Sequence, residues 1–168
     1  MEKLRQMIAF TVGVESFAVP IELVREIVRV PAITPVPDVP AAVEGVMNLR
    51  GRIVPVLNLR ACLAVMSGDS AGARPGRVVV IEIAERRVGL RVDAVSEVVK
   101  LAPEQIQRAH GLLLSSHGGC AYGIAQVADR LIVVLDLELL LQHAMRARNH
   151  AERHVARAEP ESGQATGA

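Results

Sequence analysis

Histidine and cysteine are the side chains of this 168-residue sequence best suited to bind a metal ion, and it has five histidines and two cysteines. His117 and Cys120 stand three positions apart, and His150 and His154 stand four apart, which would put the second pair on one face of a helix. A structural zinc site needs four ligands in two close pairs, and the sequence does not supply them. We therefore predict no metal site and no cofactor.

Enzyme chemistry has little support in the sequence. A phosphate-binding loop needs several glycines between a strand and a helix, whereas the stretch "NLRG" has one. Serine, histidine and aspartate are all present, but the pattern that exposes a catalytic serine on a sharp strand-to-helix turn is missing. We predict that the chain is not an enzyme and has no catalytic residues.

Glu26 and Arg50 are charged residues of the first half of the sequence. Arg50 stands beside a predicted tight turn in "GVMNLRGRIVPVLNLR". It is either an ordinary solvated turn residue or a guanidinium fixed at a recognition surface. We predict that Glu26 and Arg50 pair, or lie within a few ångströms of each other, at the rim of one β-barrel.

The stretches of sequence that must position these residues occur as an internal repeat. The stretch "FAVPIELVREIVRV" at 17–30 returns as "VGLRVDAVSEVVKL" at 88–101, and "GVMNLRGRIVPVLNLRACL" at 45–63 returns as "GIAQVADRLIVVLDLELLL" at 123–141. A long internal repeat usually means tandem copies of one structural unit. In the second copy Glu97 replaces Glu26 but Ala128 replaces Arg50, which predicts that only one unit carries the charge pair.

Each copy is predicted to contain five short strands. Alternating strands over 7–12 and 78–83 form hairpins with 17–19 and 88–90, and each hairpin leads into a short helix, which Asp93 would cap in the second copy. A β-branched strand and a second hairpin, turning at Gly51 or Asp129, complete the copy. Pro55 cannot donate to a ladder, so its strand should lie at an edge or bulge there. Short antiparallel strands without crossover helices close best as small barrels.

Composition supports a folded protein. The chain is 51% hydrophobic and 22% charged, with a formal net charge of +1 and three aromatic residues, two Phe and one Tyr. This argues against nucleic acid and against direct membrane insertion, which need a basic aromatic face or a long apolar segment. We expect a cytoplasmic protein.

The stretch "FAVPIELVREIVRVPAITPVPDVPAAVEGVMNLRGRIVPVLNLR", with "VGLRVDAVSEVVKL" and "LIVVLDLELLL", resembles the CheW family of chemotaxis coupling proteins. The resemblance covers about residues 7–141. It implies a mainly β fold of two tandem five-stranded SH3-like barrels related by a pseudo-twofold axis, with short helices and a C-terminal helix. The expected division is one CheW-like domain over 1–147, with barrel one at about 7–66 and barrel two at about 77–141, and a frayed tail over 148–168. Exchange of terminal strands between the barrels stays open.

The resemblance also implies partners and a site. Family members are not enzymes and bridge the cytoplasmic tips of methyl-accepting chemoreceptors, which form membrane arrays, to the regulatory domain of a CheA-type histidine kinase. The implied receptor face comprises Val24, Glu26, Gly45, Asn48, Arg50, Gly51 and Val98.

Three departures bear on which partners are recognised. Asn58 stands where the family usually has aspartate, Arg91 replaces a commonly apolar residue, and the tail after Leu141 is longer and more basic than the family needs. A coupler of a non-motility chemosensory pathway is therefore an alternative, and a small-barrel nucleic-acid module or an enzyme with a cryptic site are further ones.

Overall fold

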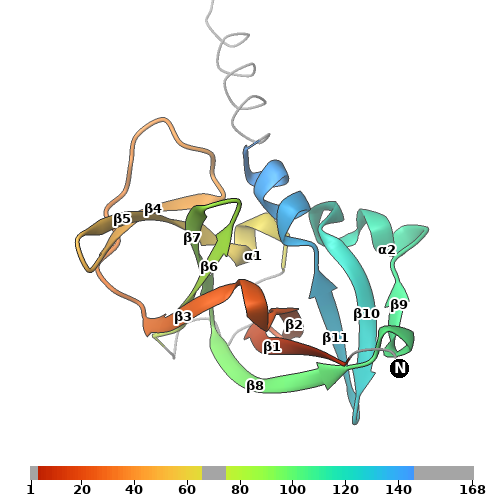
Figure 1. The fold of residues 1–168 in the computed structure, drawn as a ribbon. Coiled ribbons are helices and arrows are strands. Elements are labelled where there is room, and N and C mark those ends of the chain that lie inside the picture. The colour runs from red at the N-terminus through yellow and green to blue at the C-terminus, as the bar shows by residue number, and fades with distance from the viewer. Residues whose placement is uncertain (1–3, 66–74, 146–168) are drawn as a thin grey trace, which may run out of the picture.

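The computed structural model describes residues 4–65 and 75–145, which fold into two small β-barrels lying side by side (Figure 1). The described strands are β1 (Arg5–Val12), β2 (Glu15–Pro20), β3 (Val24–Arg29), β4 (Val43–Leu49), β5 (Arg52–Asn58), β6 (Arg77–Ile83), β7 (Arg86–Val92), β8 (Ala94–Leu101), β9 (Ile106–Arg108), β10 (Ala121–Val127) and β11 (Arg130–Leu135). The short helices are α1 (Leu59–Cys62), α2 (Leu112–Ser115) and the 3-10 turns η1 (Ile21–Leu23), η2 (Pro103–Gln105) and η3 (Ser116–Gly119). A further helix runs from residue 137 to 145. The predicted class, two β-barrels with short helices, is confirmed.

The two sheets do not coincide with the ranges 7–66 and 77–141. One sheet has the order β8-β1-β2-β11-β10-β9 and the other the order β3-β6-β7-β5-β4. The first hairpin of each copy therefore belongs to the sheet of the other copy. Parallel pairing joins them, β2 to β11 and β5 to β7.

Burial explains this exchange. The hairpin strands are buried on both faces, as in β1, where Ala9 and Phe10 are neighbours in sequence and both are fully buried. Such a strand needs apolar partners on each side, one inside a barrel and one between the barrels. Strand exchange provides both, because the hairpin lines one barrel while it also faces the other.

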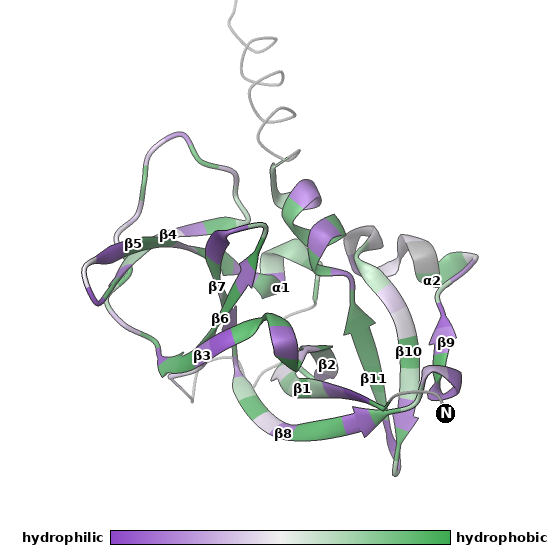
Figure 2. Cartoon of the chain, viewed as in Figure 1, coloured by the Kyte–Doolittle hydropathy of each residue, from purple (hydrophilic) through white to green (hydrophobic). Residues whose placement is uncertain are grey.

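Three hydrophobic clusters hold the fold together. The largest lies between the barrels and includes Phe10, Phe17 and Leu90, while smaller clusters around Ile132 and Val56 fill the two sheets' own interiors. In Figure 2 the strand β11 is mostly in the hydrophobic colour. Within the described residues, the two sheets thus share one hydrophobic core.

Two local predictions are settled by the hydrogen-bond pattern. β5 lies between β4 and β7, but its pairing with β7 begins at Val56, so Pro55 stands just outside that ladder and its missing N–H costs nothing there. The helix expected after β7 does not form. Asp93 does not cap it, because the strands β7 and β8 follow each other almost directly.

Candidate interaction surface

The turn between β4 and β5 holds Arg50 in a defined place. Arg50 and Gly51 both have positive φ, 52° and 83°, as a tight two-residue hairpin turn requires. The side-chain Oδ1 of Asn48 accepts a hydrogen bond of 2.8 Å from the Gly51 N–H, which closes the turn. Asn48 and Gly51, both predicted for the receptor face, therefore shape the turn that carries Arg50.

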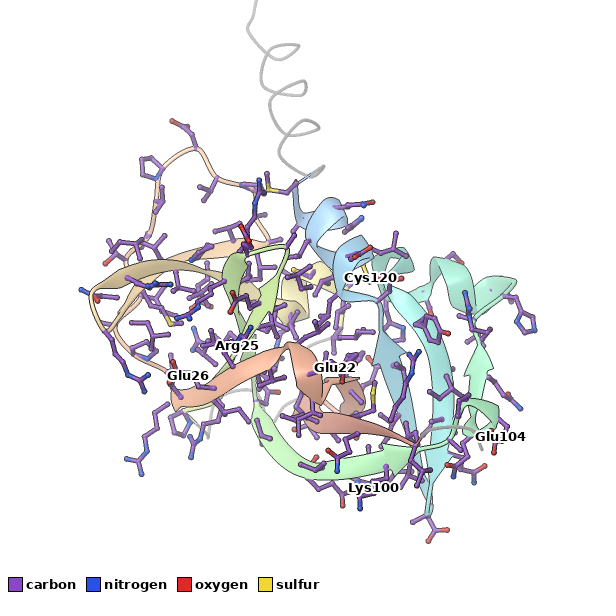
Figure 3. All side chains as sticks on the ribbon, viewed as in Figure 1. Glu22, Arg25, Glu26, Lys100, Glu104 and Cys120 are labelled. Atoms are coloured by element: carbon purple, nitrogen blue, oxygen red, sulfur yellow. The ribbon has the colours of Figure 1, made fainter. Side chains whose placement is uncertain are left out.

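Glu26 lies on β3 and pairs with this arginine. The Arg50 Nη2 donates to Glu26 Oε2 over 2.9 Å, which confirms the predicted pair. Figure 3 shows Glu26 at the end of the molecule opposite Glu104. The Arg50 side chain is 80% exposed and that of Glu26 21% exposed. The acid thus orients a guanidinium that remains available to a partner, while the pair itself adds only about 0–1 kcal/mol to stability.

The second barrel carries a pair of the same kind, so the prediction of a single pair was wrong. Glu97 on β8 forms an ion pair with Arg130, the first residue of β11. By the repeat offset of 78 positions, Arg130 corresponds to Arg52 rather than to Arg50. Ala128 keeps the turn conformation of Arg50, with φ of 53° against 52°. Pairing needs a guanidinium within reach of the acid, and either side of the turn can supply one.

The remaining predicted face residues lie in different environments. Gly45 is buried, and an added Cβ would come within 2.3 Å of the Thr34 carbonyl oxygen. Val24 is half-buried and packs on the core between the barrels. Val98 on β8 is 52% exposed, on the other sheet from Glu26 and Arg50. The structure therefore joins Glu26, Asn48, Arg50 and Gly51 in one place, while Gly45, on the same strand as Asn48, packs against the backbone of Thr34.

A hollow of about 300 Å³ lies at the seam between the barrels, and its lining residues are not among those predicted for the receptor face. It is lined by Ile27, Pro75, Gly76, Arg77, Asp93, Ala94 and Val95. Ile27 neighbours Glu26 on β3 and is 39% exposed. The repeat carried a signal for Ile27 alone, because at the offset of 71 it corresponds to Val98, which was predicted for the receptor face.

The histidine and cysteine considered first have structural partners. Nε2 of His117 lies 2.8 Å from Glu15 Oε1, and its ring packs edge-on against Phe17. Cys62 and Cys120 are buried free thiols, and burial raises the pKa of Cys62 to about 12 and that of Cys120 above its usual value. Within residues 4–65 and 75–145, no three His, Cys, Asp or Glu side chains cluster as metal ligands would. His150 and His154 lie outside the described residues.

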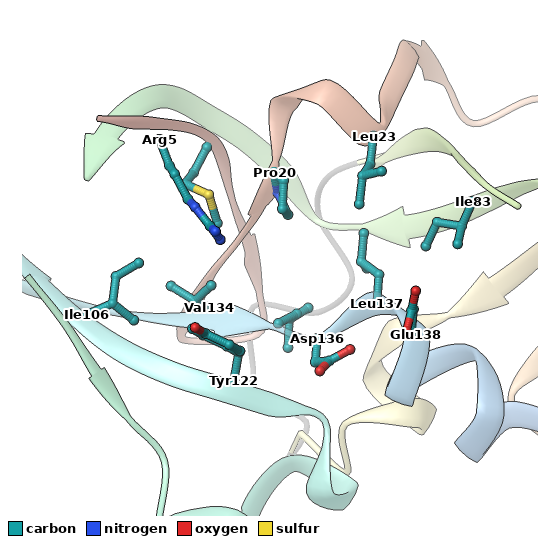
Figure 4. A pocket seen from close by; sticks show the side chains of 12 residues that line it. Arg5, Pro20, Leu23, Ile83, Ile106, Tyr122, Val134, Asp136, Leu137 and Glu138 are labelled. Atoms are coloured by element: carbon teal, nitrogen blue, oxygen red, sulfur yellow. The ribbon is translucent and has the colours of Figure 1, made fainter. Parts of the chain in front are cut away.

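A second hollow opens at the mouth of the six-stranded barrel (Figure 4). Its walls are mostly apolar, with Met7, Leu23 and Val134 among them, and Arg5 and Asp136 lie on opposite sides. Its volume of about 210 Å³ is below the ~300–1,000 Å³ of typical small-molecule sites. None of the described helices has the length and hydrophobicity to cross a membrane.

The described residues thus form a double barrel with two exposed charge pairs, Glu26–Arg50 and Glu97–Arg130. Comparison with known proteins identifies its kind: the CheW-like domain family matches residues 6–145, and the chain belongs to that family of chemotaxis coupling proteins.

Relatives and a solved structure agree. The chain is 34% identical over 134 residues to "Chemotaxis protein CheW" of Rhizobium meliloti (strain 1021), covering 80% of this chain and 85% of the relative. It is 35% identical over 136 residues to "Probable chemotaxis protein CheW" of Rhizobium etli, covering 81% and 86%. The crystal structure of the scaffolding protein TtCheW from Thermoanaerobacter tengcongensis superposes with a TM-score of 0.73 at 28% identity, covering 83% of this chain and 89% of that one.

Proposed function

We propose that this protein is a non-catalytic adaptor that couples the cytoplasmic tips of methyl-accepting chemoreceptors to a CheA-type histidine kinase in a cytoplasmic signalling array. Membership of the CheW-like family supports the adaptor class. The observation that carries the site is Arg50, an 80% exposed guanidinium held by a carboxylate at 2.9 Å.

The receptor face centres on this arginine. Arg50 offers its charge to an acidic side chain of the receptor tip, because Glu26 beneath it is largely covered and leaves the outer N–H groups free to donate. Ile27 beside Glu26 and Val98 on the other barrel supply apolar contacts, and both are partly exposed. A receptor helix with an acid flanked by apolar residues fits this chemistry.

The kinase contact is proposed at a different place. Leu112 in α2 is 90% exposed, and Leu113 beside it is 45% exposed. An exposed pair of large apolar side chains at a loop is typical of a protein contact. Because α2 leads into β10, on the six-stranded sheet, the kinase regulatory domain would bind away from Arg50 (Figure 1).

The test measures binding of the purified full-length protein to a receptor cytoplasmic tip and to a kinase regulatory domain. Arg50→Ala should weaken receptor binding tenfold or more and leave kinase binding unchanged. Leu112→Ser should do the reverse. The matched control is Arg52→Ala, which removes an exposed arginine from the other side of the same turn.

Two results would contradict the proposal. One is an Arg50→Ala protein that binds the receptor tip as well as the unmodified chain. The other is an unmodified chain that binds neither partner but binds nucleic acid at physiological salt. Binding only to the kinase and receptors of a non-motility pathway would assign the adaptor to that pathway instead.

A further inference from the structure

Asp93 stands where the chain passes from one barrel to the other. It lies between β7, in the five-stranded sheet, and β8, in the six-stranded sheet. Its backbone N–H donates to the Thr11 carbonyl over 2.9 Å. The crossing point is therefore already tied to β1 by the main chain.

The side chain of Asp93 ties two more segments together. Its Oδ2 accepts a hydrogen bond of 2.6 Å from the Gly13 N–H and one of 2.9 Å from Arg60 Nη2. Gly13 is in the turn between β1 and β2, on the six-stranded sheet, and Arg60 is in α1, which follows β5 of the five-stranded sheet. One carboxylate oxygen thus links both barrels at their crossing point.

Arg60 depends on this carboxylate. Its side chain is only 22% exposed, and its Nη1 is buried without a hydrogen-bond partner in the described part of the chain. Removing the carboxylate would leave a mostly buried guanidinium without a counter-charge, which is unfavourable and would drive the side chain toward water. Such a movement would displace α1 relative to the β1–β2 turn.

The apolar core cannot replace this link. Hydrophobic burial holds the barrels together but is non-directional, so it tolerates small rotations of one barrel on the other. Charge-assisted hydrogen bonds are short and directional, and they constrain such rotations. The walls of the seam hollow include Ile27 from one barrel and Ala94 and Val95 from the other. The shape of the hollow therefore depends on the angle between the two barrels.

We infer that Asp93 is a positioning residue that sets the angle between the two barrels and, through it, the shape of the seam hollow, where Ile27 of the proposed receptor face lies. The part of this inference that concerns receptor binding rests on the proposed function. The part that concerns the angle does not.

Distance measurement tests the angle directly. Spin labels on Ile53→Cys in β5 and Leu131→Cys in β11 report the separation of the barrels, since both positions are well exposed, at 67% and 64%, and lie on different sheets. Asp93→Asn should shift or broaden the distance distribution. The matched control Asp129→Asn, an exposed acid in the β10–β11 turn, should leave it unchanged. If Asp93→Asn does not fold, Arg60→Gln breaks the same ion pair while keeping the Gly13 bond.

Binding measurements on the unlabelled variants complete the test. Asp93→Asn should weaken receptor-tip binding severalfold and leave binding to the kinase regulatory domain unchanged. An unaltered distance distribution in both Asp93→Asn and Arg60→Gln would overturn the inference. An altered distribution with undiminished receptor binding would overturn the link to the seam. If the unmodified chain binds no receptor tip, the proposed function fails, while the distance result still decides the role of Asp93.

Discussion

The hairpin tips of the two barrels occupy equivalent places and present their charges differently. At the β4–β5 tip the Arg50 side chain is 80% exposed over a Glu26 that is 21% exposed, whereas at the β10–β11 tip Arg130 and Glu97 are 42% and 48% exposed. The first tip therefore offers a partner mainly positive charge, and the second offers a balanced pair. Both barrels pair an acid with an arginine, but the arginine is a turn residue, Arg50, in one barrel and the first strand residue after the turn, Arg130, in the other, which makes the two faces distinct.

Substitution of corresponding glycines should destabilise the two repeat copies to a similar extent. Gly45 and Gly123 correspond in the repeat, and an added Cβ would come within 2.3 Å of the Thr34 carbonyl oxygen in one case and 2.5 Å of the Gln107 carbonyl oxygen in the other. Because a backbone carbonyl cannot easily move aside, Gly45→Ala and Gly123→Ala should each lower the free energy of unfolding by about 1–3 kcal/mol. Urea denaturation measures this.

A third glycine is the control for those two. At Gly51 a Cβ meets nothing within 4 Å, and only its positive φ of 83° opposes a side chain. Gly51→Ala should therefore cost less, about 1 kcal/mol. Equal losses at all three positions would show that the close approach to a carbonyl does not matter.

The two arginines should differ in binding but not in stability. Arg50→Ala and Arg130→Ala should each change the free energy of unfolding by only about 0–1 kcal/mol, because both pairs are exposed. Arg50→Ala should weaken receptor-tip binding about tenfold, which corresponds to about 1.4 kcal/mol. Titration calorimetry of both variants gives the comparison. A larger binding loss for Arg130→Ala would reverse the assignment of the receptor face.

The reactivity of the Cys62 thiol tests whether this position is part of the core in both repeat copies. Cys62 corresponds to Leu140 in the repeat, and both are buried. Since burial raises the pKa of Cys62 from 9.0 to about 12, the reactive thiolate is scarce at pH 8, and alkylation should be at least ~100-fold slower than in urea.

The same pKa shift has a consequence for stability. The unfolded thiol ionises near pH 9 and the folded one does not, so the free energy of unfolding should fall as the pH rises above about 9. For the alkylation test, rapid modification of Cys62 in the folded protein at pH 8, detected by mass spectrometry, would contradict its buried position.

The smallest effect is expected from the C-terminal tail. Residues 149–168 lie outside the described residues, and their composition is mostly polar. Deleting them should change the free energy of unfolding by less than ~0.5 kcal/mol and leave both binding reactions as they are. A clear fall in melting temperature, or in binding to either partner, would mean that the tail contributes to the fold or to a face.

The sequence by itself determined the local elements and one contact. Short apolar runs and turn signals placed the strands. Burial alternates with a period of two in β3, as expected of a half-buried strand, but not in β1 or β6, which are buried on both faces. The repeat predicted two barrels. The pair of Glu26 and Arg50 followed as well, since both flank elements of one copy that must meet when its barrel closes.

Only the tertiary structure decided how the copies combine. Pairings such as Phe17 with Val133 join residues more than a hundred positions apart, and local periodicity says nothing about which sheet a hairpin enters. Aligning the repeat position by position missed the Glu97–Arg130 pair, because an ion pair depends on the distance between side chains and not on equivalent places in the alignment. Asp93 looked like a helix cap from its neighbours, yet its partners Gly13 and Arg60 come from both barrels. Its role arises from contacts that exist only after the chain has folded.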